Sequence, residues 1–117
     1  MSYDHGKLVD VNLVSKYIQH VVVSCAALGA NTIYTNSTTR HVAVLQYILD
    51  CATPGNTVTW EDSDGGIYSG AMPFSETGGL VAGLSDIGWF VLAPGTSLIL
   101  RLSAAAQVSG HISIDLI

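Results

Sequence analysis

The fold is decided by the stretch Ser109-Gly110-His111-Ile112-Ser113-Ile114-Asp115-Leu116-Ile117 at the C-terminal end of the chain. From residue 111 onward, polar and apolar residues alternate, as in a strand with one face on a core and the other in water. The preceding segment, residues 88–102, contains two nearly continuous apolar runs on either side of Pro94-Gly95. Because proline followed by glycine favours a tight turn, we predict three short strands in the last third of the chain.

Further strands are predicted toward the N-terminus, separated by segments that contain Gly, Pro, Asn or Ser. They cover residues 21–23, 32–35, 41–52, 57–61, 67–70 and 80–84. The longest, 41–52, is apolar on both faces: one would carry Val42, Val44, Gln46 and Ile48, and the other Ala43, Leu45, Tyr47 and Leu49. This pattern predicts a central strand covered on one side by the opposing sheet and on the other by a partner subunit.

Short strands at this spacing, with no long amphipathic helix, are typical of an all-β domain. We predict a single-domain, jelly-roll-like β-sandwich of about eight strands over residues 19–117. Residues 1–18 are polar, mixed in charge and without a sustained period. We interpret them as an N-terminal arm, either an ordered docking segment or a plain mobile terminus.

Charged residues are scarce, which predicts association. They make up 11% of the chain, against a usual value of about 25%, and the mean hydropathy is +0.44. A monomer of this size would ordinarily need more surface charge, so we expect other subunits to cover part of the surface. The remaining alternative is a monomer whose surface is built from Ser, Thr, Asn and Gly.

Several classes of partner are not expected. The net charge is −5 with only four Lys and Arg, and phosphate binding needs clustered cations, so we expect no direct nucleic-acid contact. The apolar run from Ile18 to Leu28 is too short for the ~20 residues that cross a bilayer, and the N-terminus does not resemble a secretory signal. Cys25 and Cys51 lack metal-ligand spacing and are interpreted as packed thiols, with a disulfide between them left open.

Catalytic and metal sites find little support in the pattern. The acidic segment 61–66 concentrates carboxylates, but Asp and Gly are also what a hairpin tip needs, so a solvated turn is favoured over a cation site. The four histidines are scattered, no serine lies in a nucleophile elbow, and neither cysteine has a recognisable base. We therefore expect no enzyme activity and no cofactor.

The aromatic residues allow a second class of function. Six of them, Tyr34, Tyr47, Trp60, Tyr68, Trp89 and Phe90, lie in or near predicted strands. They are interpreted mainly as core and interface anchors, with a sugar-stacking platform as the alternative.

The C-terminal half carries a family resemblance. It rests on residues 57–60 (Thr-Val-Thr-Trp), 70–74 (Gly-Ala-Met-Pro-Phe), 78–80 (Gly-Gly-Leu), 88–90 (Gly-Trp-Phe), 94–103 and 108–112, in that order. This series resembles a small β-sandwich type found among tailed-bacteriophage virion proteins, and is most similar to capsid decoration, or cement, proteins. The resemblance covers about residues 21–117 and not the arm.

The resemblance implies a structural role. A protein of this type would be made in the host cytoplasm and form homotrimers on the outer surface of an icosahedral head, over junctions of the major capsid protein. We expect capsid contacts from an arm containing Tyr3, Leu8, Val9, Val11, Leu13, Val14 and Tyr17. We expect subunit contacts from Val44, Tyr47, Trp89, Phe90 and Leu92. The alternatives are a glycan- or receptor-binding tip of a head or tail fibre, and a tail or head-completion protein.

Overall fold

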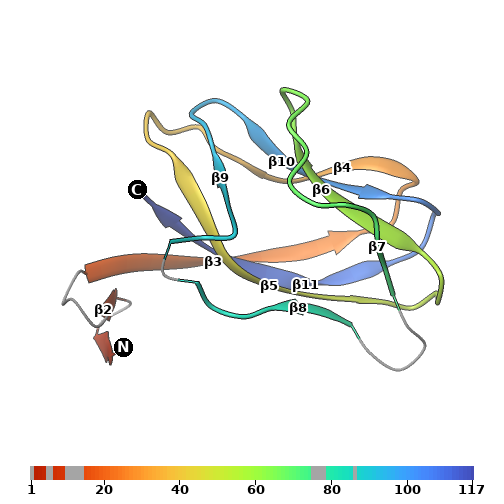
Figure 1. Cartoon of the computed structure of the whole chain (residues 1–117), viewed down its shortest axis with the longest axis horizontal. Coiled ribbons are helices and arrows are strands. Elements are labelled where there is room, and N and C mark those ends of the chain that lie inside the picture. The colour runs from red at the N-terminus through yellow and green to blue at the C-terminus, as the bar shows by residue number, and fades with distance from the viewer. Residues whose placement is uncertain (1, 5–6, 10–14, 75–78, 86) are drawn as a thin grey trace.

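The computed structural model describes residues 2–4, 7–9, 15–74, 79–85 and 87–117, with side chains from residue 18 onward. These residues form eleven β-strands and no helix (Figure 1). The strands are β1 (Ser2–Asp4), β2 (Lys7–Val9), β3 (Ser15–Cys25), β4 (Gly29–Thr35), β5 (Val42–Cys51), β6 (Thr57–Asp62), β7 (Met72–Pro73), β8 (Leu80–Ala82), β9 (Phe90–Leu92), β10 (Ser97–Leu102) and β11 (Val108–Leu116).

The strands form two antiparallel sheets packed face to face. The larger sheet has the order β1-β2-β3-β11-β5-β8, with β9 pairing the other part of β5, and the smaller has the order β4-β10-β6-β7. If β8 and β9 are counted as one interrupted strand, and β1 and β2 are set aside, four strands remain in each sheet in the order of a jelly roll. The predicted all-β, jelly-roll-like sandwich of about eight strands is therefore confirmed.

The core lies between the two sheets and is formed by the inward-facing apolar residues of both. On β10, Leu98, Leu100 and Leu102 are fully or nearly fully buried. Leu100 lies opposite Trp60 of β6, and both side chains have no exposed surface. Ile112 and Ile114 of β11 complete the core from the larger sheet. The three C-terminal strands predicted from the sequence are present as β9, β10 and β11.

A β-bulge in β5 changes which residues face the core. Val44 lies opposite Ile114, but the next pair is Gln46 with Ser113, so Leu45 has no partner of its own on β11. An extra residue of this kind reverses the alternation along the strand. The core side therefore carries Val42 and Val44 before the bulge and Tyr47 and Leu49 after it. The prediction of one face through Val44 to Ile48 is wrong for this reason.

Gly110 allows β5 and β11 to approach closely. Its φ is +155°, and a Cβ built on it would lie 1.8 Å from the carbonyl oxygen of Ile48. Only glycine fits at this point of the ladder.

Buried Asn36 ties together the turns at one end of the sandwich. Its side-chain amide donates to the carbonyls of Arg40 at 2.9 Å and Ala93 at 3.2 Å, while its Oδ1 accepts from the backbone and hydroxyl of Thr38. The turn after β4 is thus joined to the turn before β10, and the polar groups of this fully buried residue are satisfied.

The strand that returns beside β6 differs from the prediction. Residues 67–70 form only an isolated bridge, between Ile67 and Glu61, and the regular pairing is made instead by Met72 and Pro73 of β7 with Val58 and Thr57. Residues 62–66 between the two segments form a closed turn of their own, held by hydrogen bonds to the Asp62 side chain that are described below.

Candidate interaction surface

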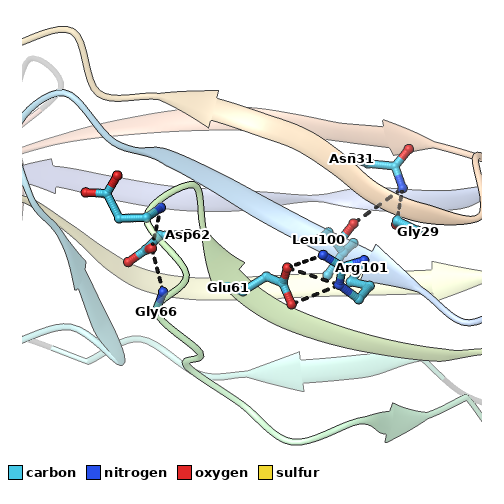
Figure 2. A network of polar contacts seen from close by, with 8 residues as sticks. Gly29, Asn31, Glu61, Asp62, Gly66, Leu100 and Arg101 are labelled. Carbon is cyan, nitrogen blue, oxygen red and sulfur yellow. Dashed lines mark hydrogen bonds and ion pairs between the residues drawn. The ribbon is translucent and has the colours of Figure 1, made fainter.

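The outer face of the smaller sheet is mainly polar, although it also carries the half-buried Ile99 of β10. Arg101 of β10 donates from Nε and Nη2 to the carboxylate of Glu61 on β6, at 2.7–3.1 Å (Figure 2). The pKa of the Arg101 guanidinium is raised by this hydrogen bond and charge pairing. Thr59 lies directly opposite Arg101 on the same face. Such a face is suited to contact with water.

The outer face of the larger sheet is different, because a row across four of its strands carries exposed apolar side chains on β3, β5 and β8. In register, Val22 of β3, His111 of β11, Ile48 of β5 and Val81 of β8 are successive neighbours. The exposed fractions are 78% for Val22, 41% for Ile48 and 69% for Val81. Ile48 and Val81 are direct neighbours, whereas His111 lies between Val22 and Ile48, so the row is a mainly apolar surface that contains one histidine.

This surface continues onto β9 and the segment before it. Trp89 and Val91 alternate with the core-facing Phe90 and Leu92, so they point to the outer side, and Trp89 is 56% exposed. The indole N–H of Trp89 donates to the carbonyl of Gly83 at 2.7 Å, which fixes the ring. We call the set Val22, Ile48, Val81, Trp89 and Val91 the outer apolar face.

A small polar cluster lies beside the apolar row. The buried hydroxyl of Ser113 accepts a hydrogen bond from Nε2 of Gln46 at 2.9 Å and lies 3.0 Å from Nδ1 of His20. The rings of His20 and His111 meet edge to face, with centroids 5.9 Å apart. The prediction that the polar side of β11 meets water is therefore wrong for Ser113 and Asp115, since both are buried within the protomer.

The five predicted subunit-contact residues occupy different environments. Val44 and Leu92 are fully buried in the core of the protomer, so they have no surface to offer another subunit and drop out of the predicted contact set. Tyr47 and Phe90 are partly buried and pack against Trp60. Only Trp89 is largely exposed.

The predicted arm is extended where it is described. Strands β1 and β2 pair with each other, and β2 pairs with Ser15 to Tyr17 at the start of β3. Figure 1 shows them at one end of the molecule, away from β6 and β10. Tyr3, Leu8, Val9 and Tyr17 lie on these strands, whereas Val11, Leu13 and Val14 lie outside the described residues.

The acidic hairpin uses its central carboxylate to close its own loop. Oδ1 of Asp62 accepts the backbone N–H groups of Asp64 at 2.9 Å and Gly66 at 2.8 Å, and Oδ2 accepts the hydroxyl of Tyr68 (Figure 2 shows the bond to Gly66). The Tyr68 hydrogen bond, with help from the two backbone bonds, lowers the pKa of Asp62. Among the described residues, no three His, Cys, Asp or Glu side chains come together as metal ligands.

The two cysteines are free thiols on the two strands that flank β11. Cys25 and Cys51 lie opposite Val108 from its two sides, so two strand spacings, about 9.6 Å, separate their backbones. A disulfide needs Cα atoms within about 7 Å, so the pair cannot bridge without movement of the backbone. Burial, and to a lesser extent the neighbouring Cys51, raise the pKa of the Cys25 thiol.

The aromatic residues form a core cluster more than a surface platform. Trp60 is fully buried and contacts Tyr47 and Phe90, and Tyr68 stacks on Phe90 with ring centroids 4.9 Å apart. Trp60 therefore has no face for a sugar ring. Of the two tryptophans among the six aromatic residues of the possible sugar-stacking platform, only Trp89 is at the surface.

Comparisons with protein-family models, curated protein sequences and solved structures found no match for the chain. Within the described part of the chain there is no helix with the length and apolar character to cross a membrane.

Proposed function

We propose that this chain is a structural virion protein, a decoration protein that forms homotrimers on the outer surface of a tailed-bacteriophage head and strengthens the shell. The observation that carries the proposal is the contrast between the two outer faces of the sandwich. One is mainly polar and ion-paired, and the other carries exposed apolar side chains across four strands. A jelly roll with one such face is suited to symmetric assembly, and this agrees with the resemblance in its turn-and-strand sequence.

The major capsid protein is the proposed partner of the N-terminal arm. Within the described ranges, strands β1 and β2 pair only with each other and with the first three residues of β3, whereas β11 pairs with β3 from Ile18 onward. An isolated two-stranded hairpin is marginal in water, so contact with a partner would stabilise it. We also infer that the hydrogen-bonded pairing of the sandwich strands does not depend on the arm.

The test is attachment to heads purified from the phage that encodes the chain but lacking this protein. The full-length chain should co-sediment with the heads in a copy number set by the icosahedral lattice. Removal of residues 1–16 should weaken attachment and leave the unfolding transition intact, because the β3–β11 pairing is retained. Equal attachment by the shortened chain would refute the role of the arm.

Copy number separates this proposal from the other structural role. A tail or head-completion protein would be present in a few copies at one vertex, whereas a decoration protein covers the lattice. Quantitative gel densitometry against the major capsid protein distinguishes the two. A vertex-limited number would contradict decoration.

A further inference from the structure

We infer that the outer apolar face seats a second copy of this chain, and that acidification weakens this contact through His20 and His111. The inference rests on the proposed function, because it assigns the surface through which the proposed homotrimer would form. It replaces the buried Val44 and Leu92 with exposed residues of the same sheet.

The distribution of charge favours a copy of the chain as the occupant. The chain carries a net charge of −5, so two copies repel each other over most of their surfaces. Among the described side chains, the face formed by β3, β11, β5 and β8 holds no Lys or Arg. Among the same side chains, the only exposed carboxylate is that of Asp50, at the end of the face opposite Ser109. A face with so little charge can lie against a surface of a neighbouring acidic copy at low electrostatic cost.

The face supplies much of the area that a stable contact between copies needs. Four strands at ~4.8 Å spacing and a β11 of nine residues at ~3.4 Å each span roughly 600 Å² in projection, of which the part over the buried Ser113 and Asp115 is already covered by this chain, and Trp89 and Val91 add to the exposed part. A stable interface covers about 800 Å² on each partner. The chain exposes 6257 Å² in all, so such a contact would cover about an eighth of it.

The histidines make the contact sensitive to pH because they lie within the face. His111 is a member of the row, and His20 meets it ring to ring. Among the side chains that the structure describes, the other titratable groups on this face are Asp50 and the buried, already partnered Asp115, with none on β8. If a second copy covers the pair, protonation places two like charges where water is excluded, which disfavours association.

Whether acid weakens or strengthens association distinguishes contact through this face from contact through the rest of the surface. Protonation of all four histidines takes the formal net charge from −5 to −1, so overall repulsion between copies falls as the pH is lowered. Overall charge alone would therefore strengthen association in acid. Weakening in acid is expected only if the histidines are covered by the partner.

The experiment is sedimentation velocity of the full chain at about pH 7.5 and about pH 5.5, where histidine changes its charge. At the higher pH, Val22→Glu and Val81→Glu should each weaken association at least about a hundredfold, since each places a charge in the covered face. Thr59→Glu adds the same charge on the other outer face, beside Arg101, and should leave association unchanged. All three positions lie on the sheet surface, so the monomer should stay folded by circular dichroism.

In acid, the wild-type chain should associate at least about tenfold less tightly, and a His20→Gln, His111→Gln double variant should lose this response. Association of Val22→Glu and Val81→Glu at wild-type strength, or stronger wild-type association in acid, would overturn the inference. If those variants still bind heads as trimers, the proposed function survives without this face. If the wild-type chain associates through this face but never binds heads, the proposed function fails and the inference stands.

Discussion

Replacing Asp62 with alanine should open the hairpin that follows β6. The carboxylate accepts two backbone N–H groups and the Tyr68 hydroxyl, so Asp62→Ala removes three hydrogen bonds. Hydrogen bonds to a charged group contribute about 1.5–3 kcal/mol each when buried and much less near water. Because this loop is partly solvated and Tyr68 keeps a weak bond to the carbonyl of Val91, we expect a total loss of about 2 kcal/mol.

The matched control is Asp64→Ala, two residues along the same loop. The side chain of Asp64 is exposed and only its backbone N–H takes part in the closure, so its loss should change stability little. Urea denaturation at pH 7 measures both variants, and the loss at Asp62 corresponds to roughly 10 °C in melting temperature. Equal effects of the two substitutions would refute the closure by Asp62.

The dependence on pH gives the same prediction an independent check. The pKa of Asp62 is lowered in the folded chain from an ordinary value of 3.8, so its charge stabilises the fold above that value. This contribution is lost as the pH falls through the lower folded-state pKa. The stability difference between the wild-type chain and Asp62→Asn should therefore be constant from pH 7 to about 5 and shrink below about pH 4. A difference that persists unchanged at about pH 2 would show that the charge is not the cause.

Three further changes test the packing. Trp60→Ala should lower the free energy of unfolding in urea by about 3–5 kcal/mol, because the side chain is fully buried. Trp60→Phe should lower it much less, since the indole N–H has no hydrogen-bond partner among the described residues. Equal losses in the two variants would contradict this account of the core. Gly110→Ala should fail to fold or lose the cooperative transition in circular dichroism, because its Cβ would meet the Ile48 carbonyl, and a wild-type melting temperature would contradict that placement. Arg101→Ala should leave the urea midpoint nearly unchanged, because its pair with Glu61 is exposed to solvent, and a large shift would show that this pair matters to the fold.

The sandwich was predictable because several strands alternate cleanly. Ile112 and Ile114 alternate with His111, Ser113 and Asp115, and both are core residues. Pro94-Gly95 marks the turn between two of these strands, and Gly95 adopts a positive φ of 79°. Periodicity and turn chemistry together were sufficient to define the class of fold.

The contact surface was less predictable, because a continuous apolar run does not show which of its residues face the core and which face outward. In β5 every residue from Val42 to Leu45 is apolar, so the bulge at Leu45 left no trace in the pattern. The same ambiguity placed Leu92 at an interface when it belongs to the core. The row formed by Val22, Ile48 and Val81 depends on register between strands distant in sequence, and no local signal carries that information.

The most direct test of the proposed assembly is the mass of the wild-type chain in solution, measured by sedimentation equilibrium over a wide concentration range at neutral pH. A homotrimer is expected, three times the 12.3 kDa of the single chain, in equilibrium with the monomer at low concentration. A constant mass of 12.3 kDa up to the highest concentration that remains soluble would contradict association through the outer apolar face and the trimeric decoration role together.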